Sequence, residues 1–381
     1  MRRRTRVIWS GATAALTAAL VTAAASAGVV QTLNERRTGR VALRDGGVTV
    51  EGKAIATEEV LVAVLDRQGG TFRQRNTIHL TNGEVWHGDI LGLSDGKLRV
   101  RLPLIGTKEV DSSAVRALEF QAKLGPEDGL ETNRLYRKEG EPLPGKILWI
   151  NREQVAVDSP LGAIAMDREG STRFLLAKAH RSKASDGEAE VVLVDGSVLR
   201  GRLTLDRNSI TLDHAALGKL GIPAAAVRSF LRHVPRGVHL SELDFLAKTT
   251  PLLGSGPAGD QVKVLPPGRT GGDGTCVQSL VIRPETELRV RLPGDSAGAW
   301  TFRATAAPLA GARGDVMLRV LAGGKALLVK RLAASTKNPA PISVSLGGSR
   351  SMTIEVTFDQ RARFPCGVVL GDPHVVRHGG T

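Results

Sequence analysis

Residues 82–106 read NGEVWHGDILGLSDGKLRVRLPLIG, and two later stretches repeat their pattern. The copies are EGEPLPGKILWINREQVAVDSPLG at residues 139–162 and DGSVLRGRLTLDRNSITLDHAALG at residues 195–218. Three sets of glycines correspond at a spacing of about 56 residues: Gly83, Gly140 and Gly196; Gly88, Gly145 and Gly201; Gly106, Gly162 and Gly218. A fixed period of this length marks a repeated structural unit, so the sequence predicts three copies of one small fold.

Each copy alternates apolar and polar residues with a period of two. In KLRVRLPL, residues 97–104, Leu98, Val100 and Leu102 occupy one face of an extended chain, which is typical of a half-buried strand. Helical periodicity is weak after the N-terminus; residues 112–124 and 224–232 have room for a helical turn or two. We therefore predict an all-β protein in which each copy is a short antiparallel meander.

The predicted repeats span about residues 76–125, 133–180 and 188–236, after an opening β segment at residues 28–75. The opening segment alternates in the same way and is either an opening sheet or a degenerate half-copy. A unit this small cannot bury its own apolar face, so neighbouring copies are expected to pack into a barrel or a sandwich. The sequence leaves open whether they form one domain or several.

One copy contains a match to a phosphate-binding loop, G-x-x-x-x-G-K, at residues 140–146. Such a loop needs Ser or Thr after the lysine and then a helix, but Ile147 follows Lys146 and a strand pattern comes next. The other copies have Asp89 and Arg202 in place of Lys146, while the glycines recur. We interpret the match as the turn and bend of a β unit, not as a nucleotide site.

The first 27 residues have the pattern of a secretory signal peptide. MRRRTR is basic, an apolar stretch follows, and Ala25-Ser26-Ala27 provides the small residues at which a signal peptidase cuts. The alternative is an uncleaved membrane anchor. In either case we expect an exported protein, in the periplasm, in the cell envelope or outside the cell.

Composition argues against several classes of function. The chain has 52 basic and 38 acidic residues, and removing the four arginines of the signal leaves 48 − 38 = +10, spread along strands rather than clustered. Aromatic residues are only 3% of the chain, so a nucleic-acid interface with clustered cations and stacking rings is not expected. The eight histidines show no metal-ligand spacing, and no nucleophile motif is present. We predict no metal, no cofactor and no enzymatic activity.

The two cysteines, Cys276 and Cys366, form an even pair in a chain expected to be exported. A disulfide is the usual outcome in an oxidising compartment. A bridge closing a loop of about 90 residues would stabilise the fold by roughly 4 to 5 kcal/mol in the chain-entropy account. We therefore predict a Cys276–Cys366 disulfide.

Residues 238–381 form a second predicted β domain, with a Gly- and Pro-rich linker at residues 251–274. The order of SELDF, TTP, GGDGTCVQSLVIRPETELRVRLP, GDVMLRVLAGGKALLVKRL and PAPISVSLGGSRSMTIEVTF resembles a divergent member of the NPCBM family of carbohydrate-binding modules. That resemblance implies a galactose-binding-like jelly-roll β-sandwich. It departs from the family at Gly274-Thr275-Cys276-Val277 and at the closing FPCGVVLGDPHVVRHG, where the family's distinctive polar residues lie.

Sugar recognition usually combines an aromatic or apolar surface with a few convergent polar groups. Three residues of the C-terminal domain are candidates for this role: Trp300 as the ring, and Asp372 and His374 as the polar pair. The alternatives are that Trp300 is a core residue and that Asp372-Pro373-His374 is a surface turn.

The function favoured by the sequence is non-catalytic binding of a glycan or another envelope component through this C-terminal domain. A second interpretation is a structural or protein-interaction protein without sugar binding. A third is a hydrolase whose site the sequence does not reveal.

Overall fold

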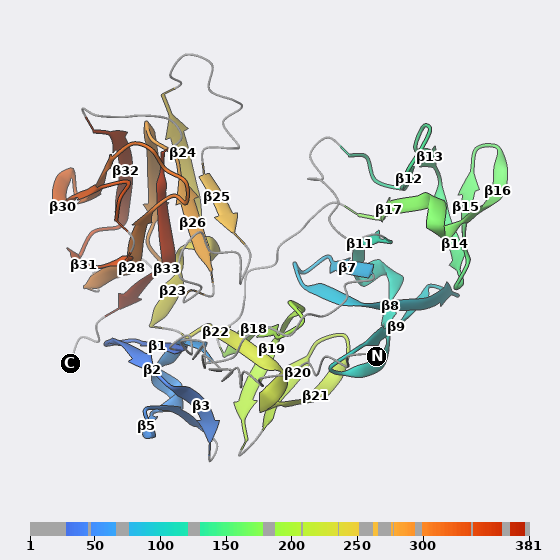
Figure 1. Ribbon diagram of the computed structural model, residues 1–381, viewed down its shortest axis with the longest axis horizontal. Coiled ribbons are helices and arrows are strands. Elements are labelled where there is room, and N and C mark those ends of the chain that lie inside the picture. Colours follow the sequence, from blue (N-terminus) through green and yellow to red (C-terminus); the bar gives the residue numbers. More distant parts are fainter. Residues whose placement is uncertain are drawn as a thin grey trace, which may run out of the picture.

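The computed structural model describes residues 28–44, 47–65, 76–120, 130–177, 187–206, 209–234, 236–250, 262–265, 276, 278–293, 299–336, 338–359 and 366–377 (Figure 1). The predicted signal peptide and most of the predicted linker lie outside these residues. Almost every element is a strand, and neighbouring strands pair antiparallel. The all-β prediction is confirmed. No helix among the described residues is long and apolar enough to cross a membrane.

The N-terminal part consists of four units with one plan: consecutive strands pair as hairpins, a 3₁₀ turn follows, and the last strand pairs back onto the first. Unit 1 contains β1 (Gly28–Thr32), β2 (Arg36–Gly39), β3 (Val41–Arg44), β4 (Gly47–Val50), β5 (Lys53–Ile55), η1 (Thr57–Glu59) and β6 (Val60–Val64). Unit 2 contains β7 (Asn76–Leu80), β8 (Val85–Ser94), β9 (Lys97–Leu102), β10 (Gly106–Asp111), η2 (Ser112–Ala114) and β11 (Val115–Glu119).

Unit 3 contains β12 (Arg134–Arg137), β13 (Leu143–Pro144), β14 (Lys146–Ile150), β15 (Gln154–Ser159), β16 (Gly162–Asp167), η3 (Arg168–Gly170) and β17 (Ser171–Leu175). Unit 4 contains β18 (Glu188–Leu193), β19 (Val198–Leu205), β20 (Ser209–His214), β21 (Gly218–Pro223), η4 (Ala224–Ala226) and β22 (Val227–Arg232). The first and last strands pair in every unit, as β1–β6, β7–β11, β12–β17 and β18–β22. The segments with room for helical turns each hold one 3₁₀ turn and then a strand.

One backbone hydrogen bond recurs in all four units. The residue just after the first strand donates its N–H to the carbonyl of the last residue of the 3₁₀ turn. The pairs are Leu33 with Glu59, Thr81 with Ala114, Lys138 with Gly170, and Val194 with Ala226. The opening segment therefore carries the complete strand order of the later units rather than half of it.

The second glycine of the pattern lies where two strands approach closely. A Cβ at Gly145 would lie 2.3 Å from the carbonyl oxygen of Asp158, and one at Gly201 would lie 2.4 Å from that of Asp213. Real Cβ atoms do not come this near, so only glycine lets the strand pass. This close approach accounts for Gly145, the second glycine of the match to a phosphate-binding loop at residues 140–146.

The four units pack around one apolar core, to which fully buried Trp86 belongs. The Trp86 indole N–H donates to the Glu84 carboxylate at 2.8 Å, and His214 of unit 4 contacts the same carboxylate at 2.8 Å. Units join edge to edge through β11–β17 and β6–β22, which pair the last strands of two units.

The C-terminal part is a sandwich of two antiparallel sheets. One sheet has the order β25-β26-β33-β28-β31 and the other β24-β27-β32-β29-β30. The strands of the first sheet are β25 (Val262–Leu265), β26 (Ser279–Ile282), β28 (Trp300–Pro308), β31 (Ala340–Gly347) and β33 (Val368–Arg377). Those of the second are β24 (Phe245–Thr249), β27 (Thr286–Arg291), β29 (Val316–Ala322), β30 (Lys325–Leu332) and β32 (Ser351–Phe358). A separate apolar core fills the space between the sheets.

The sandwich contacts the N-terminal units along β33. The short strand β23 (Gly237–His239), just before η5 (Leu240–Glu242), pairs with β33. Val376 of β33 packs in a small apolar cluster with Val29 of unit 1 and Leu231 of unit 4. The Arg303 guanidinium on β28 donates to the Leu33 carbonyl at 2.5 Å. These contacts involve β33 and β28 of the first sheet, while the outer residues of β31 and the outer face of the second sheet remain accessible.

Candidate functional site

Trp300 lies inside the sandwich and not on its surface. Its exposed fraction is 4%, and it belongs to the core between the two sheets. Neighbouring Phe302 is fully buried in the same core. A ring in this position offers no face to a ligand, which corrects the prediction of Trp300 as a binding residue and agrees with the core alternative.

Asp372 and His374 lie close together on β33, but they are buried against the N-terminal units, with exposed fractions of 1% and 4%. Asp372 accepts the backbone N–H of Gln278 at 3.0 Å and lies 3.7 Å from the Arg36 guanidinium. His374 donates from Nδ1 to the Asp372 carbonyl at 2.7 Å. The prediction of a ligand-binding pair is corrected: these residues join two parts of the chain, and neither is on a surface turn.

The predicted disulfide is absent, because Cys276 and Cys366 are both buried free cysteines. The Cys276 sulfur lies 3.7 Å from the Thr305 hydroxyl and against Gly371. Cys366 precedes Gly371 by five residues of extended chain, about 16 Å at the rise of a strand. A disulfide requires Cα atoms within about 7 Å, so the two thiols are too far apart. Burial raises the pKa of the Cys366 thiol, which keeps it neutral.

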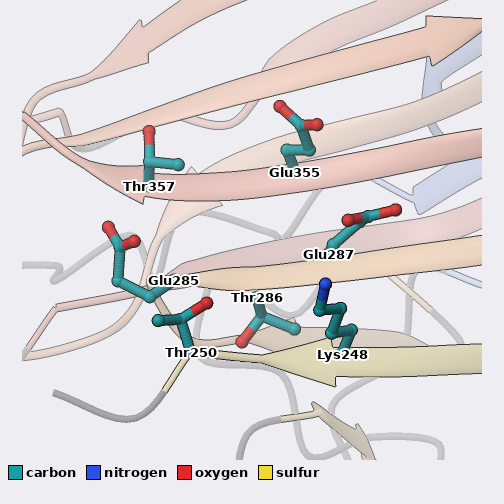
Figure 2. Close-up of a pocket in the computed structure, with 7 residues that line it drawn as sticks. All are labelled: Lys248, Thr250, Glu285, Thr286, Glu287, Glu355 and Thr357. Atoms are coloured by element: carbon teal, nitrogen blue, oxygen red, sulfur yellow. The ribbon is translucent and has the colours of Figure 1, made fainter. Parts of the chain in front are cut away.

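The open face of the sandwich carries a shallow polar pocket of about 250 Å³ over β24, β27 and β32. We call it the outer-face pocket (Figure 2). Its lining residues are Lys248, Thr250, Glu285, Thr286, Glu287, Glu355 and Thr357. Strand alternation produces this set, because Glu287 and Glu355 point outward between core residues such as Leu288 and Ile354.

Charged residues cross the outer-face pocket in one row. Lys248 is the register partner of Glu287, and Glu287 is that of Glu355 (Figure 2). The row ends at Arg319, 3.8 Å from the Glu355 carboxylate, while Arg289 lies 3.4 Å from the Glu287 carboxylate. Like charges directly opposite one another in a sheet are unfavourable, so the Glu287–Glu355 pair has a cost that a bound donor group would offset.

Glu285 closes one end of the pocket in an uncommon backbone conformation. Its φ of 58° lies in the left-handed region, which residues with a side chain seldom adopt. A side-chain oxygen of Glu285 accepts the backbone N–H of Phe358 at 3.2 Å, and its carbonyl accepts that of Thr250 at 2.9 Å. These bonds hold the carboxylate at the rim beside Thr250 and Thr357.

The chemistry of the outer-face pocket is that of hydrogen bonding. Carboxylates accept hydrogen bonds, threonine hydroxyls donate and accept them, and Lys248 donates. Within the described part of the chain, no group of three or more His, Cys, Asp or Glu side chains could hold a metal ion. The alternation of TELRVR and SMTIEVTF in the sequence indicated that these glutamates face outward. It did not indicate that Glu287 lies opposite Glu355, because the two strands are far apart in the chain.

A larger hollow, of about 850 Å³, lies where units 2 and 3 meet, and Phe120, Arg168 and Lys138 are among its lining residues. The Arg168 guanidinium donates to the Ile90 carbonyl at 2.9 Å and to the Asn76 side chain at 2.7 Å, and it lies over the Phe120 ring. Burial lowers the pKa of Arg168. Since this cation joins two units, we assign the hollow to the packing between them.

Comparison with known proteins gives distant structural likenesses only. No family model and no curated protein matches the chain. A carbohydrate-binding module of family 51 from a Clostridium perfringens GH95 protein, solved with methyl-galactose, is 15% identical over 37% of this chain and 99% of its own, with a TM-score of 0.29. Tandem family 51 modules of a family 98 glycoside hydrolase from Streptococcus pneumoniae are 12% identical over 68% of this chain and 92% of their own, with a TM-score of 0.30.

A family 6 module from Clostridium stercorarium, solved with cellobiose, is 10% identical over 38% of this chain and 93% of its own, with a TM-score of 0.23. Scores this low carry no argument about the ligand of this chain. The sandwich assignment rests on the strand pairings described above.

Proposed function

We propose that the protein is an exported, non-catalytic binding protein whose outer-face pocket binds a carbohydrate. The observation that carries the proposal is the convergence of three glutamates, one lysine and three threonines in a pocket on the accessible face of the sandwich. A sugar presents many hydroxyl groups that donate and accept hydrogen bonds, which suits this set of side chains. The resemblance of residues 238–381 to NPCBM modules supports the same choice.

The charge of the outer-face pocket narrows the kind of glycan. Its lining residues include three glutamates and one lysine, and the adjacent Arg289 and Arg319 bring the formal charge of the site to 3 − 3 = 0. Phosphate- and uronate-rich polymers would meet carboxylates there. We therefore expect a neutral glycan or one bearing free amino groups.

The test is calorimetric titration of residues 28–381 with neutral and amino-sugar cell-wall oligosaccharides. Hydrogen bonds to charged groups contribute about 1.5 to 3 kcal/mol, so the double substitution Glu287→Gln with Glu355→Gln is expected to weaken binding roughly 10- to 100-fold or more. Ser345→Ala, on an exposed position of the other sheet, is the matched control and should bind as the parent does.

Two results would contradict the proposal. If no oligosaccharide binds, or if the double variant binds as tightly as the parent, the structural or protein-interaction alternative takes its place. If new reducing ends appear during incubation with the glycan, the protein is a hydrolase.

A further inference from the structure

The strand just before the 3₁₀ turn of each N-terminal unit forms a sheet edge. In the part of the chain that the structure describes, β5, β10, β16 and β21 each pair with a single neighbour, the strand before them. An edge strand presents unpaired backbone N–H and C=O groups to which another strand can add. The four edges are equivalent by position in the unit, so their sequences can be compared directly.

Three of the four edges carry features that discourage strand addition. β5 is only three residues long and begins with Lys53; β10 contains Lys108 and Glu109. β21 contains Lys219 and ends with Pro223. Charged side chains, proline and short length are the usual protections of an exposed edge.

The edge of unit 3 has none of these features over its first five residues. β16 reads GAIAMD, with its only charge at the last position, Asp167. Ala163 and Ala165 are exposed, and Leu161, in the turn just before the strand, is 88% exposed. The matching turn residues of units 2 and 4, Ile105 and Leu217, instead pack partly buried against the core. An apolar edge of this kind is expected to be covered in solution.

We propose that β16 pairs antiparallel with β16 of a second copy of this chain. The chain already joins its own units by this kind of contact, because β11–β17 and β6–β22 are antiparallel pairs of equivalent last strands. A two-fold contact needs a surface complementary to itself. The uncharged stretch before Asp167 meets that need, since no like charges face one another along it.

The position of β16 in the molecule and the charge of the chain are both consistent with a second copy as the partner of this edge. The β15–β16 hairpin lies at the opposite end of the molecule from the sandwich, so the bulk of each copy stays clear of the contact (Figure 1). With a formal charge of 48 − 38 = +10 for residues 28–381, two copies repel over most of their surface, and a neutral edge is a place where they can approach. Six residues bury less than the ~800 Å² per partner of a standard interface, so the dimer is weak and concentration-dependent.

Sedimentation equilibrium of residues 28–381 tests the proposal. The mass of the parent should rise from one chain towards two as its concentration increases from about 1 μM to 1 mM, the range of weak association. Ala163→Lys with Ala165→Lys places charges of one sign on both strands of a two-fold pair and alters only exposed side chains. This variant should associate at least tenfold more weakly. Thr107→Lys, at the exposed equivalent position of β10, is the control and should associate as the parent does.

Two results would overturn the proposal. If the unsubstituted protein stays monomeric at every concentration, a second copy does not cover the β16 edge. The partner of the edge would then be an extended segment of a different protein. Association that persists in the doubly substituted chain, with an unchanged melting temperature, would place the self-contact elsewhere.

Discussion

Trp300 shows how a single aromatic residue serves the fold. Its ring is buried between the sheets together with Phe302. Replacing a buried Trp with Ala removes apolar contacts and leaves a cavity, so Trp300→Ala should lower the free energy of unfolding by about 3 to 5 kcal/mol. Urea unfolding measures this loss. Val329→Ala, at a position 55% exposed on β30, should change stability by no more than about 0.5 kcal/mol. Similar losses in both variants would contradict the core assignment.

His374 should make stability depend on pH. Burial lowers its pKa from 6.5 to about 4, and the nearby Arg303 and Arg36 act in the same direction, while its bond to the Asp372 carbonyl opposes them. The folded chain therefore keeps this imidazole neutral between pH 6.5 and about 4, whereas the unfolded chain protonates it. The unfolded state binds the extra proton, so this contribution lowers stability as pH falls through that range, by roughly 3 kcal/mol in all.

The measurement is chemical unfolding at pH 7 and at pH 4.5 for the parent and for His374→Gln. The variant lacks the titrating group, so it should lose less stability over this interval than the parent does. Equal losses would mean that the imidazole is protonated in the folded chain as readily as in the unfolded one.

The residue scale is also where prediction from sequence failed. The sequence offers Trp300, Asp372 and His374 as an aromatic residue and a polar pair suited to sugar recognition, but all three are buried. Alternation cannot show that β33 is covered on both sides, because one side faces the sandwich core and the other faces unit 1, more than 300 residues earlier in the chain. Similarly, the even number of cysteines suggested a pair but contained no information about the distance between Cys276 and Cys366 in the fold.

At the scale of elements, two glycines of unit 4 give a matched test of the close strand approach. A Cβ at Gly201 would lie 2.4 Å from the Asp213 carbonyl oxygen, whereas one at Gly221 would meet nothing within 4 Å. Gly201→Ala should therefore destabilise the protein by about 1 to 3 kcal/mol, as overpacking does. Gly221→Ala should be neutral or stabilising by a few tenths of a kcal/mol, because it restricts only the unfolded chain. Thermal unfolding of both variants decides, and equal melting temperatures would refute the steric account.

Elements were the part of the structure most readily predicted from sequence. The period-two alternation identified the strands. A Gly-Gly pair between two alternating stretches is typical of a hairpin turn, and Gly323-Gly324 connect β29 to β30 with positive φ at both residues. The helical turns expected near residues 112 and 224 are single 3₁₀ turns, since three residues between two strands leave no room for more. The pairing of distant strands, such as Val198 of β19 with Val85 of β8, leaves no local signal in the sequence.

At the scale of the whole molecule, the N-terminal units contact the first sheet of the sandwich, and the outer-face pocket lies on the second. The N-terminal units contact β33 and β28 of the first sheet, whereas the outer residues of β31 stay exposed. Arg200 of unit 4 pairs with Glu190 and lies 4.0 Å from Glu242 of η5. The outer face of the second sheet is accessible, and the carboxylates and hydroxyls of the outer-face pocket lie there. Sequence patterns predicted a sandwich and an N-terminal array, but not the contact between them.

The bond from Arg303 to Leu33 provides a test of that contact. Burial lowers the pKa of Arg303, although the guanidinium stays charged at neutral pH, and its donor Nη1 lies 2.5 Å from the Leu33 carbonyl of unit 1. Arg303→Met keeps much of the aliphatic volume but leaves that carbonyl without this donor, at a cost of about 1.5 to 3 kcal/mol. The cost should appear as faster hydrogen exchange, roughly tenfold or more, at the amides of β1 and β2, with units 2 and 3 unchanged.

Arg319→Met, the same change on the outer face of the second sheet, should leave β1 and β2 protected. If exchange in β1 and β2 is the same in both variants, the arginine does not hold the sandwich against unit 1, and the apolar cluster around Val376 must do so alone.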